Sequence, residues 1–134
     1  MTTTVREGIV LHRLAKKAGT KVTVGFIERY NQGLERLKEI IQRGDIGIVR
    51  YLTTSRISKY STALGRIGVI LDAAIHDIDA IRYVLEEDPV RVYAEGRNNI
   101  PQHPSGLETS AEIFLSFAGG KSAHLITEWL DPDG

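Results

Sequence analysis

One segment of the sequence, residues 68–79, places a histidine among three aspartates within an otherwise apolar stretch. If this segment is helical, Asp72, His76 and Asp79 are spaced at i, i+4 and i+7 and share one face. A carboxylate one turn from an imidazole can fix its tautomer and raise its basicity, so the group could transfer a proton. The same spacing is also typical of the wet side of an amphipathic helix, and both interpretations stay open on spacing alone.

A helix is needed to hold these side chains in place, and the surrounding residues favour one. Apolar side chains recur at helical spacing on the opposite side of the same segment, at Ile78, Ile81 and Leu85. We therefore predict one helix over residues 69–85, with its apolar side packed on a sheet. Asp72 and His76 should then be accessible along the opposite edge, at an open cleft.

Two helices and two strands are expected earlier in the chain. Thr4 and Glu7 have the spacing of a capping box, which predicts a helix that starts there and ends at Gly19. Asn31 is a typical cap residue, and the helix that it starts should end at Gly44. The two strands are predicted at Lys21–Phe26 and Gly47–Ile57.

Three more strands are predicted after the helix over residues 69–85, because apolar and polar residues alternate there. Their ranges are Val90–Glu95, Ala111–Phe117 and Ser122–Leu130. Residues 118–121 include two glycines and should join the last two strands as a hairpin. Together the elements predict an α+β fold, with helices packed on one face of a mostly antiparallel β-sheet.

Composition limits the classes of protein to which the chain can belong. With 134 residues, 42% of them hydrophobic, it can form one ordinary core. Seventeen basic residues balance seventeen acidic ones, which disfavours a nucleic-acid partner. No apolar run approaches the length of a membrane span, and the absence of cysteine excludes disulfides and thiolate chemistry. We expect a cytoplasmic protein with no membrane partner.

Three segments in order then carry a family resemblance: Val24–Asn31, Leu37–Gly47 and Gly68–Asp79. They follow the order "VGF-x-x-R-[FY]-N", a helix ending in "G-x-[IL]-G", a strand, and "G-x-x-x-D-x-x-x-H-D-[IL]-D". This order resembles the glucose-fructose oxidoreductase, inositol dehydrogenase and MocA-like family of NAD(P)-dependent sugar and polyol oxidoreductases. The residues from Ala111 to Trp129 match the strands that follow in that family. The ending from Trp129 to Pro132 looks most like the branch that oxidises UDP-linked amino sugars.

The departures from the family pattern concern the cofactor. Complete members begin with a Rossmann domain that has a glycine-rich turn for the dinucleotide, and no segment here matches that turn. The family's E-K-P motif should precede Thr4, where the chain has Met1-Thr2-Thr3. We therefore expect residues 1–27 to be the last helix and strand of a Rossmann domain that is missing here. Residues 28–134 would be the C-terminal substrate and oligomerisation domain, incomplete at its C-terminus. NAD or NADP would serve the full-length protein, and no cofactor is expected for this chain alone.

The resemblance implies roles for the residues of the opening motif. His76 matches the acid/base that takes the proton from a sugar hydroxyl, and Asp72 matches the carboxylate that contacts substrate and orients the histidine. Asp79 shares their helix face and could also touch substrate. Asp77 points aside, and we favour a structural pairing for it.

Further candidates lie outside that motif. Arg56 and Lys59 could bind a phosphate linked to the sugar, or could be solvated cations of a loop. Asn31 should be a helix cap first and a neighbour of the cofactor site second.

Two functions from other classes remain open as alternatives. The doublet of His76 and Asp77 could belong to a metal-dependent phosphohydrolase, although such a site needs further ligands and His12 is the one other helical histidine expected. The chain could also be a non-enzymatic oligomerisation module. Trp129 and the Phe residues alternate along the predicted strands and are most simply sheet-packing residues. If an aromatic face of the sheet is exposed, it would be the surface at which a homo-oligomer forms.

Overall fold

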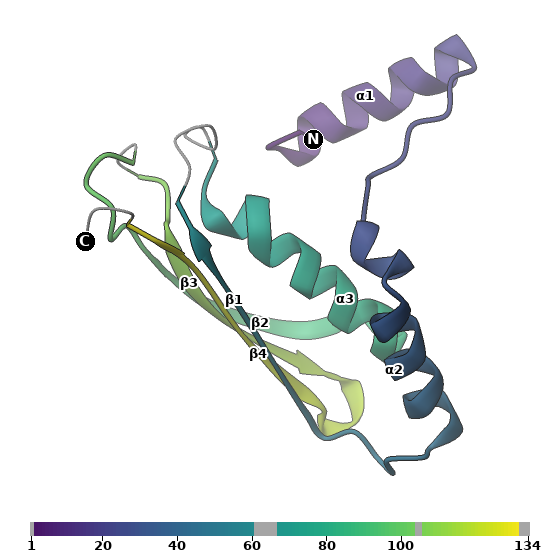
Figure 1. Ribbon diagram of the computed structural model, residues 1–134. Coiled ribbons are helices and arrows are strands. Elements are labelled where there is room, and N and C mark those ends of the chain that lie inside the picture. The colour runs from purple at the N-terminus through teal and green to yellow at the C-terminus, as the bar shows by residue number, and fades with distance from the viewer. Residues whose placement is uncertain (1, 61–66, 104–105, 132–134) are drawn as a thin grey trace.

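The computed structural model describes residues 2–60, 67–103 and 106–131. A four-stranded sheet forms the body of the protein, and the helices α2 and α3 lie on one side of it (Figure 1). The first helix, α1, stands apart and is joined to the rest by an extended segment. The predicted α+β class is therefore confirmed.

The chain begins with α1, Val5–Ala18. The predicted capping box is present: the Thr4 hydroxyl accepts the N–H of Glu7, and the Glu7 carboxylate accepts the N–H of Thr4. Gly19 ends the helix in the left-handed conformation, with φ of 64°. None of the side chains of α1 is buried, so the helix makes no part of the core.

The prediction of a strand at Lys21–Phe26 is wrong, because these residues are extended but belong to no strand. The sheet contains β1 to β4 only, and within the described chain no strand pairs with this segment. β-branched residues favour an extended backbone, but a strand forms only where a neighbour supplies the ladder of hydrogen bonds.

A short 3-10 helix, η1 (Ile27–Tyr30), leads into α2 (Gln32–Arg43). Asn31 caps α2 as predicted, since its side-chain oxygen accepts the N–H of Gly33 at 2.9 Å. Gly44 ends the helix with φ of 72°, also as predicted. Apolar side chains on one face of α2 pack partly against the core.

The strands are β1 (Tyr51–Lys59), β2 (Pro89–Arg97), β3 (Ser110–Phe117) and β4 (Ser122–Leu130). Their order in the sheet is β1-β4-β3-β2. β4 pairs with β3 as the predicted hairpin, and β3 pairs with β2, both antiparallel. β1 pairs with β4 in parallel, which the sequence pattern did not indicate.

The predicted helix over residues 69–85 forms, and its first turn is irregular. This turn, η3 (Ile70–Ala74), is π-helical, and the α-helix α3 continues it over Ile75–Leu85. In the π turn the N–H of Ile75 bonds to the carbonyl of Ile70, so the turn contains one more residue than an α turn. The helix ends at Glu86, which adopts a left-handed φ of 53°.

The core lies between this helix and the near face of the sheet. Alternate side chains of β3 and β4 are buried there, as strand geometry requires. Trp129 and Leu125 of β4 meet Ile81 and Leu85 of the helix in one cluster. Ile78 packs partly against the same cluster, so the predicted apolar side of the helix is confirmed.

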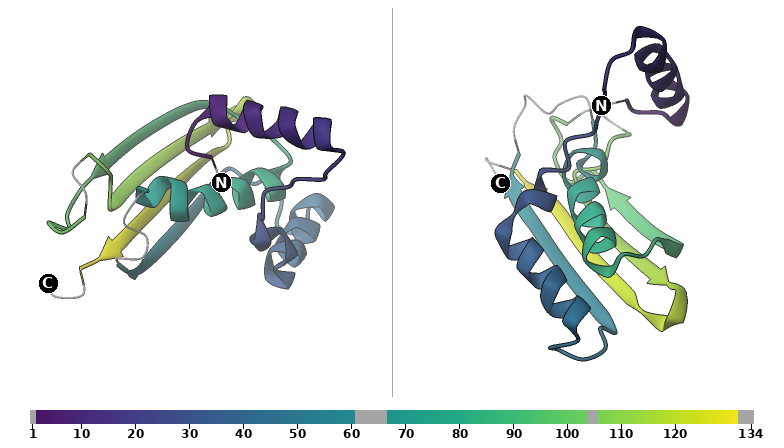
Figure 2. Two further views of the ribbon diagram at one scale, coloured as in Figure 1. Left: turned by 90° about the horizontal axis from the view of Figure 1, so that it is seen from above. Right: turned by 90° about the vertical axis from the view of Figure 1, so that its right-hand side faces the viewer.

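The far face of the sheet carries no described helix, as Figure 2 shows. Its central side chains are Phe114 and His124, whose rings stack at 4.1 Å and 5°. Tyr93 continues the row at the β2 side, with its ring 6.3 Å from that of Phe114. No helix among the described residues is long and apolar enough to cross a membrane.

Candidate functional site

The two residues at the centre of the sequence motif lie on successive parts of one helix. Asp72 is within the π turn η3, and His76 is in the first turn of α3. Both side chains are partly exposed, so His76 is not sealed in the core. Its Nδ1 atom is buried without a hydrogen-bond partner among the described residues. Asp72 therefore does not hold Nδ1, as a tautomer-fixing carboxylate on that side of the ring would.

Asp79 is placed differently from its expected position beside substrate. It is 2% exposed, and both of its oxygens accept hydrogen bonds from Arg29, at 2.7 Å from Nε and 2.6 Å from Nη2. This pairing is the main cause that raises the pKa of Arg29. The Arg29 guanidinium also lies over the rings of Phe26, at 5.4 Å, and Tyr83, at 5.7 Å. A substrate-binding role for Asp79 stays a prediction and requires this ion pair to open.

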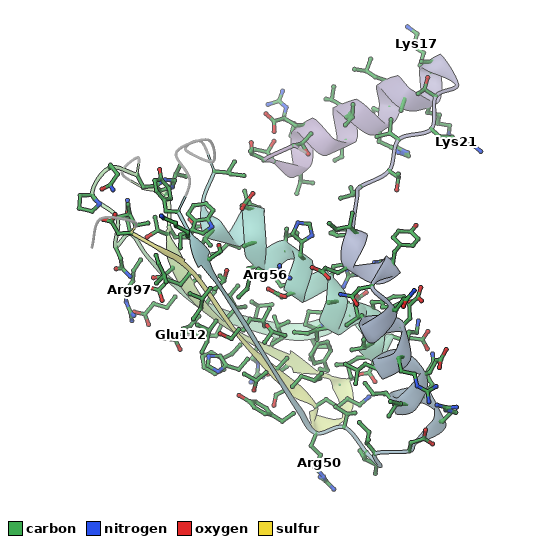
Figure 3. All side chains as sticks on the ribbon, in the orientation of Figure 1. Lys17, Lys21, Arg50, Arg56, Arg97 and Glu112 are labelled. Carbon is green, nitrogen blue, oxygen red and sulfur yellow. The ribbon has the colours of Figure 1, made fainter. Side chains whose placement is uncertain are left out.

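Arg56 projects from β1 toward the helix and is labelled in Figure 3. Its Nε and Nη2 atoms donate to the two oxygens of Asp77, at 2.8 and 3.0 Å. Nη2 also donates to Oε1 of Glu28 at 3.2 Å. The hydrogen bond to Asp77 is the largest cause that raises the pKa of Arg56. The structural pairing favoured for Asp77 is confirmed, and phosphate binding by Arg56 stays a prediction.

Glu28 is a residue near the site that the sequence reasoning missed. It belongs to η1, and the hydrogen bond from Arg56 is the main cause that lowers its pKa, followed by one from the amide of Asn31. A charge on His76 is the smallest of the causes that lower the pKa of Glu28. Because Glu28 lies 48 residues before His76, no helical spacing could have indicated it; the signal was its place within the ordered motif of residues 24–31.

Two of the predicted site residues remain, Asn31 and Lys59. Asn31 serves as the cap of α2, which accounts for its side chain. Lys59 is exposed at the end of β1, and residues 61–66, part of the predicted irregular segment, lie outside the described chain. Within the described ranges, no group of three or more metal-binding side chains could hold a metal ion.

The described helix N-termini do not fit a dinucleotide pyrophosphate. Such a group needs free backbone N–H groups and no competing negative charge. The start of α1 is occupied by the carboxylate of Glu7, and that of α2 by the side chain of Asn31. The start of the helix over residues 69–85 is occupied by the carboxylate of Glu108, which accepts the N–H of Ile70. What the arrangement offers instead is one partly exposed imidazole, which follows Asp72 by four residues on the same helix and suits proton transfer.

Comparison with known proteins agrees with this arrangement. The GFO/IDH/MocA C-terminal domain model matches residues 34–134. An uncharacterized oxidoreductase YrbE of Bacillus subtilis is 32% identical over 118 residues, covering 81% of this chain and 33% of that protein. A myo-inositol 2-dehydrogenase of Thermotoga maritima is 30% identical over 111 residues, covering 78% of this chain and 33% of that protein.

Solved structures give the same fold. The myo-inositol 2-dehydrogenase of Lactobacillus plantarum aligns with a TM-score of 0.79 at 25% identity, covering 98% of this chain and 42% of that one. The UDP-N-acetylglucosamine 3-dehydrogenase GnnA of Acidithiobacillus ferrooxidans has the same fold, with a TM-score of 0.70 at 23% identity over 94% of this chain and 39% of that one. The chain spans about a third of the length of the curated relatives that it matches. Its sequence and its fold show that this chain belongs to the GFO/IDH/MocA family of oxidoreductases, in the part that forms the C-terminal domain.

Proposed function

We propose that this chain is the substrate-binding domain of an NAD(P)-dependent oxidoreductase that oxidises a ring hydroxyl of a sugar, polyol or nucleotide-sugar. The observation that carries the proposal is His76, which is partly exposed on the same helix as Asp72 and is not sealed in the core. One relative is named a myo-inositol 2-dehydrogenase, and GnnA, which shares the fold, is named a UDP-N-acetylglucosamine 3-dehydrogenase; both names refer to compounds with ring hydroxyls.

The chemistry assigns one step to this chain. Oxidation of an alcohol removes a hydride from carbon and a proton from oxygen, and a positioned imidazole near neutral pH can accept that proton. Because Nδ1 of His76 is buried, we assign the transfer to Nε2. The hydrogen bond from Arg56 keeps Glu28 in place at the edge of this site.

The dinucleotide would be held by a domain outside this chain. In support, α1 exposes apolar side chains that a neighbouring domain would cover, among them Val5, Ile9 and Leu14. Residues 1–27 are then the end of the cofactor domain, and residues 28–134 belong to the substrate domain.

We further propose that the far face of the sheet joins two copies of the chain. The side chains of this face include Tyr93, Phe114 and Ile57, which are 61%, 42% and 53% exposed. Apolar side chains that are exposed singly are normal on a monomer, whereas a contiguous aromatic row of this kind marks an interaction surface. The same observation favours the second candidate function, an oligomerisation module. The metal-dependent phosphohydrolase has no support among the relatives, which are oxidoreductases.

A titration of the chain with candidate substrates tests the substrate-domain proposal. The signals of the imidazole of His76 would be followed by NMR while myo-inositol or UDP-N-acetylglucosamine is added, with His12 of the separate helix α1 as the internal control. We expect one compound to shift His76 and leave His12 unchanged. If neither these compounds nor other polyols and nucleotide-sugars shift His76 at millimolar concentration, the assignment of this site is wrong.

A further inference from the structure

The start of the helix that carries Asp72 and His76 is held by a residue far along the chain. Gly68 occupies the cap position, since its carbonyl accepts the N–H of Asp72 at 3.1 Å, and it has no side chain to cap the helix. Glu108 replaces that missing cap. Its carbonyl accepts the N–H of Val69 at 2.8 Å, and its carboxylate accepts the N–H of Ile70 at 3.1 Å.

The carboxylate of Glu108 fills the space that a cap side chain would need. A Cβ atom added to Gly68 would overlap that carboxylate. On the β2 side, a Cβ atom added to Gly96 would lie only 3.1 Å from the Cβ of Glu108. Gly68 and Gly96 therefore leave a slot for the side chain of Glu108. Neither glycine has a positive φ, so backbone conformation does not explain why glycine stands at these two positions.

Ile70 connects this slot to the site. The N–H of Ile70 is bound by Glu108, and its carbonyl accepts the N–H of Ile75 in the π turn. Asp72 lies inside that turn, and His76 directly follows Ile75. A return to α geometry would give the carbonyl of Ile70 the N–H of residue 74 instead, which would rotate Asp72 relative to His76.

We propose that Glu108 is a positioning residue, whose carboxylate holds the π turn and so sets how Asp72 and His76 face one another. A carboxylate suits this position because the N-terminus of a helix carries partial positive charge, and a bond to a charged acceptor is stronger than a neutral one. The claim that Glu108 holds the π turn can be tested without any enzymatic activity. Only the importance of this turn for proton transfer rests on the proposed function.

The test compares variants of the chain by NMR. Amide exchange is measured at Ile70 and Ile75, together with the ring signals of the four histidines. Glu108→Ala should accelerate exchange at both amides by about ten- to a hundredfold, the range that one bond to a charged group represents. It should also shift His76. Glu108→Gln keeps an acceptor oxygen on a side chain of the same shape. Its amide exchange and its His76 ring signals should therefore stay close to those of the unchanged protein.

A second comparison uses the glycine. Gly68→Ala should displace the carboxylate and reproduce the changes of Glu108→Ala, but it should add little when Glu108 is already alanine. Glu112→Ala is the matched control, because Glu112 lies on the far face of β3 and bonds to His124 at 3.3 Å, so it should shift His124 and leave His76 unchanged.

Two results would overturn the proposal. The first is a Glu108→Ala protein in which Ile70 alone is affected and Ile75 and His76 are unchanged, since Glu108 would then be an ordinary cap. The second is that Gly68→Ala changes amide exchange and the His76 signals equally, whether residue 108 is glutamate or alanine. If Glu108→Ala does not fold, the Gly68→Ala and Glu108→Gln proteins give the same decision: unchanged His76 signals in Gly68→Ala contradict the proposal. None of these results depends on whether His76 is catalytic.

Discussion

Arg29 and Asp79 form an ion pair, and we expect removal of one partner to destabilise the fold more than removal of the other. The side chain of Asp79 is 2% exposed, whereas that of Arg29 is 43% exposed. Removing the arginine therefore leaves a buried carboxylate without its counter-ion, and removing the aspartate leaves a guanidinium that water can reach. We expect Arg29→Ala to lower the free energy of unfolding by about 3–5 kcal/mol, the usual cost of an uncompensated buried charge.

The same reasoning gives a smaller cost for the other partner. Asp79→Ala loses the two hydrogen bonds, but Arg29 keeps its contacts with water and with the rings of Phe26 and Tyr83, so we expect about 1–2 kcal/mol. The double variant should be more stable than Arg29→Ala alone, because the buried charge is gone.

Urea unfolding of the variants measures these costs, provided that the slope stays the same between proteins. Arg36→Ala is the matched control: its pair with Glu39 is exposed on both sides and should contribute less than about 1 kcal/mol. The reasoning is refuted if Asp79→Ala costs as much as Arg29→Ala, or if the double variant is less stable than Arg29→Ala.

Three further predictions concern pH, cofactor and assembly. The pKa of Glu28 is lowered in the folded chain, chiefly by Arg56, so its contribution to stability is present above its unfolded pKa and is lost as pH falls. Glu28→Gln should therefore weaken the loss of stability below about pH 4.5, measured by urea unfolding at several pH values. An unchanged dependence of stability on pH would contradict this prediction. Calorimetry with NAD and NADP should give no heat beyond dilution, and micromolar binding to this chain would contradict the assignment of the cofactor to another domain. Sedimentation should show self-association of the chain that Phe114→Glu abolishes, while the same change with no effect on mass would show that the far face of the sheet is not the interface.

The sequence predicted those parts of the fold that depend on local pattern. The helix over residues 69–85 and the hairpin of β3 and β4 follow from periodicity and turn residues, and both are present. The parallel pairing of β1 with β4 joins segments about 70 residues apart, and no local signal specifies it. The strand predicted at Lys21–Phe26 failed for a related reason, since its pattern is local but its partner is not in the described sheet.

The candidate site divides in the same way. Spacing placed Asp72 and His76 on one helix, as the structure has them. The ion pairs next to them join distant segments: Arg56 of β1 binds Asp77, the residue after His76, and also Glu28 of η1. The π turn also escaped prediction, because the carboxylate that binds it comes from Glu108, 38 residues after Ile70. Ion pairs and helix caps between residues far apart in the chain produce no periodic pattern in the sequence.

The most direct test of the central claim is the rate of NAD(P) reduction by an enzyme in which this chain is joined to a dinucleotide-binding domain, compared between His76 and His76→Ala. We predict that kcat falls about a hundredfold to ten-thousandfold while KM changes little, because the imidazole acts in proton transfer and not in uniform binding. A His76→Ala enzyme that turns over at the original rate would contradict the account and leave the polar side of the helix as a solvated surface.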